Sequence, residues 1–124
     1  MGVDIAKARA FVAEKERRQQ TALLRKLRRA RSDFQKIVAL IVEKYQPLRI
    51  YQWGSLLDEF SFSEISDIDI AMEGITSAET FFQIYGDAMD LTDFPVHVVQ
   101  LEKIEPEFRE LIVTQGKLIY ERPR

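Results

Sequence analysis

Two aspartates and a Gly-Ser pair have residue types and spacing suited to phosphate chemistry. Gly54 and Ser55 follow a short apolar segment, and Asp67 and Asp69 stand two residues apart shortly afterwards. Residues two apart on a strand point to the same face, so both carboxylates could hold the same metal ions. Magnesium takes hard oxygen ligands, usually one or two carboxylates with phosphates and water. Glycine lets the backbone approach a phosphate closely, and the serine hydroxyl adds a hydrogen-bond donor. These residues therefore predict a site for a metal-bound nucleoside triphosphate.

The order of these features is more informative than any one of them, because Gly-Ser pairs and paired aspartates are common in turns and on surfaces. An apolar strand over Leu48–Trp53 precedes Gly-Ser, and a short helix over Leu56–Phe60 follows it. After the loop 61–66, Ile68 and Ile70 alternate with the two aspartates, which is typical of a strand with carboxylates on one face. This order favours a functional site over chance surface residues.

Bulk composition indicates one ordinary globular domain. The chain has 124 residues, of which 46% are hydrophobic and 31% are charged. There is no cysteine, which excludes disulfides, thiolate metal sites and thiol catalysis. The first thirteen residues include charged side chains and no long apolar run, unlike a signal peptide or a membrane span. We therefore expect a cytoplasmic protein without a membrane partner.

Charge is distributed unevenly along the chain. Residues 1–45 carry twelve Lys and Arg against five Asp and Glu, whereas residues 46–124 carry six against fifteen. Five of the basic residues cluster within seven positions: Arg25, Lys26, Arg28, Arg29 and Arg31. We favour a solvated basic helix face for this cluster, with RNA or an acidic partner as the minor alternative.

The N-terminal third of the chain predicts a long helix. Neither Gly nor Pro occurs in residues 3–45, and a broad apolar stripe runs from Leu23 to Tyr45 before Pro47 ends it. Residues 14–21 contain no apolar side chain. One unbroken helix would be ~60 Å long, against a radius of gyration of ~14 Å for a compact domain of this size. Either the helix breaks near residues 19–21, or its first half projects as an arm. Such an arm would need a partner for four apolar residues, most simply a second copy of the chain: Ile5, Ala8, Phe11 and Val12.

The remaining periodicities complete the predicted fold. A helix is expected over Ser77–Leu91, a strand over Pro95–Leu101, a helix over Glu105–Thr114 and a closing strand over Leu118–Tyr120. We predict an α+β fold with a small mixed β-sheet and helices packed on one face, preceded by the long helical segment. The chain is one domain, 1–124, with a helical segment over 1–45 and a core over 46–124.

The motif residues resemble a known family. Gly54-Ser55, followed by Ser66-Asp67-Ile68-Asp69-Ile70-Ala71 and Glu73-Gly74, is similar to the minimal nucleotidyltransferases of the polymerase-beta-like superfamily, over about residues 50–120. The resemblance implies this fold and transfer of a nucleotidyl, most simply adenylyl, group from ATP with Mg²⁺, or Mn²⁺ as an alternative. It implies that Asp67 and Asp69 bind the metal and that Gly54, Ser55 and Ser66 bind the nucleotide. Many prokaryotic members act as antitoxins of a HEPN-domain protein, which implies such a partner here.

One departure from the family pattern bears on activity. Where the family usually has a third carboxylate on the next strand, this chain has His97, its only histidine. Imidazole suits manganese or zinc better than magnesium and can still accept a proton near neutral pH. His97 is therefore either an alternative base or ligand, or a residue tolerated at a site that no longer catalyses. Two functions follow: an enzyme that uses Asp67, Asp69 and His97, or a binding module that keeps the fold and acts through protein contacts.

Overall fold

The computed structural model describes residues 4–54 and 67–124. The expected helix over residues 56–60, the loop 61–66 and the two candidate nucleotide-binding residues Ser55 and Ser66 lie outside the described residues.

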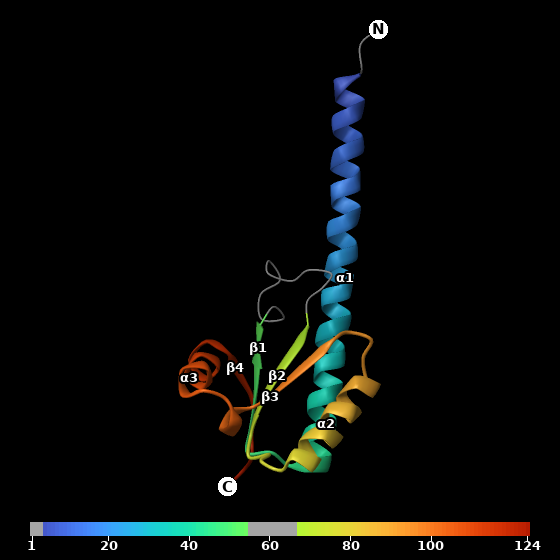
Figure 1. Ribbon diagram of the computed structural model, residues 1–124. Coiled ribbons are helices and arrows are strands. Elements are labelled where there is room, and N and C mark those ends of the chain that lie inside the picture. Colours follow the sequence, from blue (N-terminus) through green and yellow to red (C-terminus); the bar gives the residue numbers. More distant parts are fainter. Residues whose placement is uncertain (1–3, 55–66) are drawn as a thin grey trace.

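Helix α1 (Ile5–Tyr45) is continuous over 41 residues. Its N-terminus is capped by Asp4, whose carboxylate accepts a hydrogen bond from the Lys7 backbone N–H at 3.1 Å. It ends at Gln46, which has a left-handed φ of 51° and directly precedes Pro47. The alternative of a break near residues 19–21 is therefore wrong, and the first half of α1 projects beyond the rest of the molecule (Figure 1).

Ion pairs along the helix account for its continuity through the polar stretch. Glu14 pairs with Arg17 one turn later and with Arg18 at 3.2 Å. Pairs at these spacings stabilise a helix by a few tenths of a kcal/mol each without any apolar packing.

The sheet has four strands in the order β3-β2-β1-β4. They are β1 (Arg49–Trp53), β2 (Ile68–Glu73), β3 (Val96–Gln100) and β4 (Lys117–Glu121). β2 and β3 run parallel and are joined by α2 (Ala78–Asp90), whereas β1 is antiparallel to both β2 and β4. The short helix η2 (Leu101–Lys103) and α3 (Pro106–Gln115) connect β3 to β4. The predicted α+β class with a mixed sheet is confirmed.

The helices cover both faces of the sheet. α1 and α2 pack on one face, in a core that includes Ile37, Ile41, Ile70 and Ile84. α3 packs on the other face, where Ile112 and Phe108 contact strand residues whose side chains point away from α1 and α2: Tyr51, Ala71 and Val99. The expectation of helices on one face therefore holds for α1 and α2 and needs correction for α3 (Figure 1). The physical reason is that β1 and β2 are buried on both faces at their centres, so the second face also needs an apolar cover.

Candidate functional site

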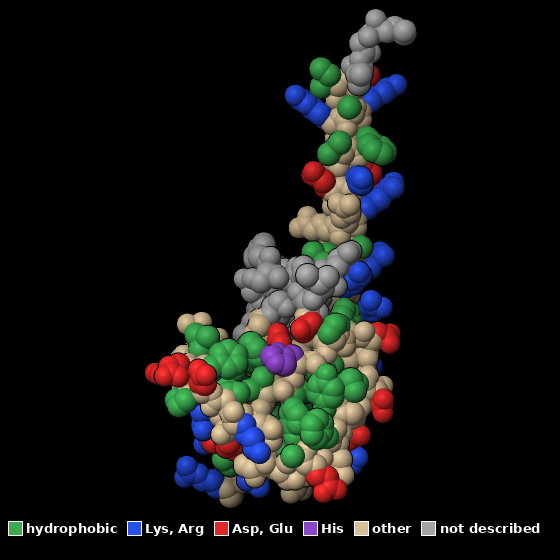
Figure 2. All heavy atoms as spheres, viewed as in Figure 1, with side chains coloured by type: hydrophobic (Ala, Val, Ile, Leu, Met, Phe, Trp, Pro, Cys, Tyr) green, Lys and Arg blue, Asp and Glu red, His purple; other side chains and the backbone are tan. Residues whose placement is uncertain are grey.

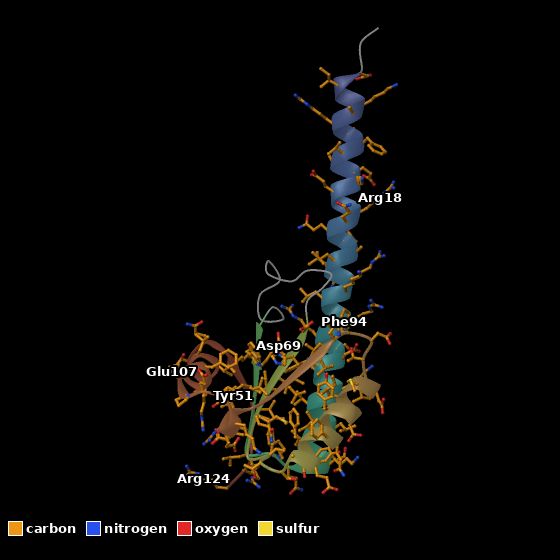
Figure 3. All side chains as sticks on the ribbon, in the orientation of Figure 1. Arg18, Tyr51, Asp69, Phe94, Glu107 and Arg124 are labelled. Carbon is orange, nitrogen blue, oxygen red and sulfur yellow. The ribbon has the colours of Figure 1, made fainter. Side chains whose placement is uncertain are left out.

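Strand register brings three chemically distinct residues into one row. Trp53 on β1 is paired with Asp69 on β2, and Asp69 is paired with His97 on β3. His97 Nδ1 lies 3.4 Å from Asp69 Oδ1. Figure 3 shows Asp69 near the end of the sheet, and the single histidine is exposed beside acidic side chains on the face seen in Figure 2.

Gly54 contributes its backbone to this row. Its φ of +81° is in the left-handed region that favours glycine. A Cβ atom at this position would overlap Asp69 Oδ2 and lie 2.9 Å from Cγ of the same carboxylate. The backbone of Gly54 therefore lies directly against Asp69, because residue 54 has no side chain.

The environment of Asp69 penalises its ionised form. Its side chain is only 13% exposed. The pKa of Asp69 is raised to about 6, mainly by burial; His97 acts to lower this pKa, and the neighbouring charge of Asp67 acts to raise it. A half-buried carboxylate of this kind is typical of functional sites, since a bound cation would stabilise its charge.

The residues present fit a divalent cation as a partial ligand set. Asp69 and His97 offer an oxygen and a nitrogen side by side, and Asp67 lies close enough to raise the pKa of Asp69. Among the described residues no three ligating side chains gather into a complete cluster. A cation here would complete its coordination with phosphate oxygens and water, as Mg²⁺ usually does. The nitrogen donor favours Mn²⁺ over Mg²⁺ relative to an all-carboxylate site.

An aromatic wall borders the site and was not predicted from the sequence, in which Trp53 is only the last residue of the expected strand Leu48–Trp53. The Trp53 ring lies 5.5 Å from His97 and 5.5 Å from Phe108, with the second pair edge to face. Beside it, a cavity of about 240 Å³ is lined by uncharged residues: Trp53, Gly54, Phe108, Leu111, Ile112, Gln115 and Gly116. The only sequence signal for this wall is that Trp53 directly precedes Gly54.

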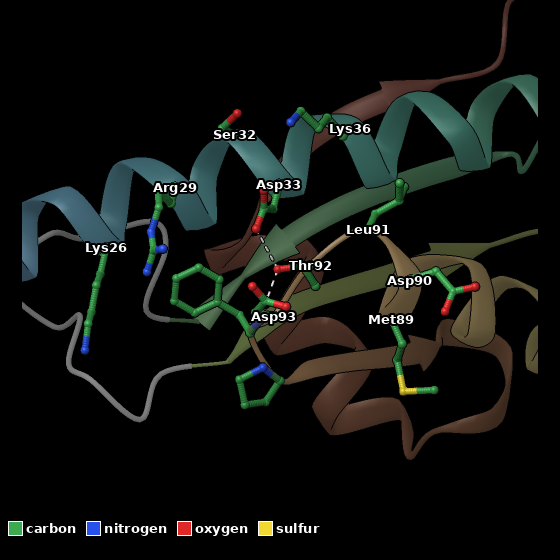
Figure 4. A pocket seen from close by; sticks show the side chains of 12 residues that line it. Lys26, Arg29, Ser32, Asp33, Lys36, Met89, Asp90, Leu91, Thr92 and Asp93 are labelled. Carbon is green, nitrogen blue, oxygen red and sulfur yellow. Dashed lines mark hydrogen bonds between the residues drawn. The ribbon is translucent and has the colours of Figure 1, made fainter.

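The basic cluster of α1 lies elsewhere. Lys26 and Arg29 line a separate pocket between α1 and the segment that follows α2 (Figure 4). Arg29 lies over the Phe94 ring at 5.6 Å, and Thr92 donates a hydrogen bond to Asp33 at 2.7 Å. Arg29 is exposed and also contacts an aromatic ring of the fold.

Comparison with known proteins decides the family. The family described as polymerase beta, nucleotidyltransferase matches residues 35–124, which include all four strands and every candidate site residue. The chain belongs to this nucleotidyltransferase family. The match begins within α1, so the projecting half of that helix lies outside the family's common core. No curated protein matches the chain significantly.

Solved structures confirm the nucleotidyltransferase fold. A chain of the crystal structure of the toxin-antitoxin MntA-HepT matches with a TM-score of 0.57 and 22% identity, over 73% of this chain and 72% of that one. A chain of a crystal structure of the toxin-antitoxin with AMP-PNP matches with a TM-score of 0.61 and 24% identity, over 71% and 73%. At these identities the likeness shows the fold. In the described part of the chain, no helix is both long enough and apolar enough to cross a membrane.

Proposed function

We propose that this chain is a minimal nucleotidyltransferase-like protein that transfers a nucleotidyl group, most simply adenylyl, from ATP with a divalent metal ion. The proposal rests on the position of Asp69 between the Gly54 backbone and the His97 ring, in a chain of the nucleotidyltransferase family. We call these three residues the Gly54, Asp69 and His97 row. Asp69 lies against the Gly54 backbone, and its Oδ1 is 3.4 Å from His97 Nδ1.

Each residue has a separate role in the proposed transfer. The Gly54 turn, with Ser55 and Ser66, binds the phosphates through backbone and hydroxyl donors. Asp67 and Asp69 bind Mg²⁺ or Mn²⁺, which would neutralise phosphate charge and polarise the α-phosphate. The acceptor's hydroxyl oxygen bonds to the α-phosphorus while the bond to the pyrophosphate oxygen breaks. His97 is our candidate to receive the hydroxyl proton, since its side chain is 54% exposed and so accessible to an acceptor.

A second function is favoured by the same histidine. In parallel register with Asp69, His97 occupies the position on β3 where the resemblance leads us to expect the third carboxylate. Replacing that carboxylate removes a negative charge and a hard ligand from the metal site. The alternative proposal is therefore a catalytically impaired module with this fold, which acts only by protein-protein interaction.

The proposed partner is a HEPN-domain toxin, for which this chain is the antitoxin. The support is that the similar solved structures are toxin-antitoxin complexes and that one of them holds AMP-PNP. We further propose that the chain forms a homo-oligomer through the exposed half of α1. We also propose a cytoplasmic location for the protein.

Calorimetric titration of ATP, with Mg²⁺ and then Mn²⁺, separates the two functions. The wild type, Asp69→Asn and His97→Asp are compared. Binding to the wild type that Asp69→Asn destroys supports the enzyme. Absence of wild-type binding, restored by His97→Asp, supports the impaired module. Equal binding by all three proteins would overturn the assignment of the site.

A further inference from the structure

Two exposed apolar faces on this chain match each other, and they lie on different parts of the molecule. The first is the arm face, formed by Ile5, Ala8, Phe11 and Val12 on the projecting half of α1. Ile5 is 63% exposed and Phe11 is 71% exposed, and a shallow groove runs along the Ile5, Ala8 and Val12 side of the helix. Figure 2 shows hydrophobic side chains along the arm with no other part of the chain beside them.

The second is the α2 face, formed by Phe82, Gly86 and Met89 on the outer side of α2. Phe82 is 68% exposed and Met89 is 48% exposed. The three residues recur at spacings of four and three, so they form one stripe along the helix. Phe81, which packs against the core, meets the Phe82 ring edge to face with ring centroids 5.5 Å apart.

Gly86 leaves a gap in this stripe, because it has no side chain. A Cβ atom at Gly86 would contact nothing within 4 Å, so nothing inside the chain requires glycine there. Glycine within a helix costs about 1 kcal/mol relative to alanine. Between two large exposed apolar side chains, the missing side chain leaves room for an apolar group from another molecule.

Charge makes the two faces complementary. Over residues 5–22, Lys and Arg outnumber Asp and Glu by five to two, whereas α2 carries three acidic residues and no basic one. Of these, Glu79 and Asp90 lie beside the stripe, and Asp87 is held by Lys44 and Tyr45 of α1. Apolar centres with rims of opposite charge are the pattern of specific interfaces.

The length of α1 shows that the arm cannot reach the α2 face of its own chain. α2 is tied to the C-terminal half of α1, where Asp87 accepts hydrogen bonds from Lys44 at 3.0 Å and from Tyr45 at 2.5 Å. Residue 37 of α1 packs in the same core cluster as Ile84 of α2. Residue 8 of the arm lies 29 helical positions from residue 37, or ~43 Å along a straight helix. A second copy, turned antiparallel about a two-fold axis near the middle of α1, would place each arm beside the other copy's α2. Two-fold symmetry would bury each contact twice.

We propose that the α2 face is the docking site for the arm of a second copy of this chain, in a reciprocal antiparallel dimer. The inference deepens, and rests on, the proposed association through α1 by naming the surface that receives the arm. It leaves the Gly54, Asp69 and His97 row outside the contact, so nucleotide binding and dimerisation are separately measurable.

Because the chain has no cysteine, single cysteines can report the contact directly. Full-length Val12→Cys and Gly86→Cys chains are mixed and oxidised gently, and the products are separated and identified by mass spectrometry. The expected product is a disulfide between residue 12 of one chain and residue 86 of the other. The matched control is Ala10→Cys, an equally exposed small residue on the opposite side of the arm, which should give no such product.

The other products overturn the proposal. A disulfide joining two Val12→Cys chains would show that arms pair with arms, and two Gly86→Cys chains joined together would show that α2 faces pair. If only monomers are recovered, the two faces do not bind each other and the proposal is wrong. Light scattering of Phe82→Asp and Phe11→Asp gives a second reading without cysteines, and both variants should shift to monomers. ATP titration of the same variants should match the wild type, so loss of the dimer is distinguishable from failure of the nucleotide site.

Discussion

Gly54 and Asp69 lie in contact such that the carboxylate occupies the space a side chain at residue 54 would need. The contact joins the residue after β1 to the second residue of β2, and it explains why residue 54 is a glycine. Both the left-handed φ and the steric conflict oppose any larger residue there. The close packing of the Gly54 backbone and the Asp69 carboxylate therefore depends on the absence of a side chain at residue 54.

Gly54→Ala should weaken ATP binding by at least about tenfold, or about 1.4 kcal/mol, because the new Cβ displaces Asp69 or the turn. Calorimetric titration with Mn²⁺ measures the change. The matched control is Gly86→Ala, since its Cβ meets open space within a helix. That variant should leave ATP affinity unchanged. Equal ATP affinity in both variants would contradict a role for the Gly54 contact.

Asp69→Asn should stabilise the metal-free protein at neutral pH. The folded-state pKa of Asp69 is raised to about 6, above its ordinary value of 3.8. Folding therefore penalises the ionised carboxylate, and the cost is absent below pH 4 and complete above pH 6. Because Asp69→Asn removes this cost, its free energy of unfolding should exceed that of the wild type by on the order of 1 to 3 kcal/mol at pH 7 and should equal it at pH 4.

Urea unfolding of the wild type and Asp69→Asn, measured from pH 4 to 8 without metal, tests this pH dependence. Val113→Ala is the control, because it removes an exposed apolar side chain of α3 and no titratable group, so it should leave the shape of the pH profile unchanged. A stability difference between Asp69→Asn and the wild type that stayed constant over this range would show that Asp69 titrates at its ordinary pKa.

His97→Asp should make the metal-free protein less stable and more responsive to Mg²⁺. In the wild type His97 lowers the pKa of Asp69, and an aspartate at residue 97 would instead add a negative charge near Asp69. Thermal unfolding should show a lower Tm without metal and a larger Mg²⁺-induced rise than in the wild type. His97→Asn adds no charge, so its Mg²⁺ response should stay close to that of the wild type. A His97→Asp variant indifferent to Mg²⁺ would exclude this row as the metal site.

Local signals predicted most of the fold. Asp4 and Pro47 mark the ends of α1, and the alternation of Ile68 and Ile70 with aspartates correctly places Asp69 on the face opposite the α1 core. The side of the sheet covered by α3 was not predictable, because periodicity identifies apolar positions and not the face they meet. The polar stretch 14–21 was ambiguous because ion pairs stabilise a helix without leaving an apolar stripe.

The site was less predictable than the fold, since it depends on register between distant segments. The motif identified Gly54, Asp69 and His97 as separate candidates. Their contact depends on β1 pairing with β2 and on β2 pairing in parallel with β3, 28 residues along the chain. The placement of Trp53 against His97 depends on both strand pairings, so no local sequence pattern predicts it.

Fluorescence of Trp53 should report the occupancy of the site. It is the only tryptophan in the chain, and its ring lies 5.5 Å from His97, which is itself 3.4 Å from Asp69. A cation or nucleotide that draws Asp69 and His97 into coordination changes the charge beside the indole, so the emission should shift in intensity on addition of Mn²⁺ and ATP. Asp69→Asn should abolish this response, whereas Phe82→Ala, on the outer side of α2, should retain it. A response that survives in Asp69→Asn would place the ligand elsewhere on the molecule, and the Gly54, Asp69 and His97 row would then have no part in nucleotide binding.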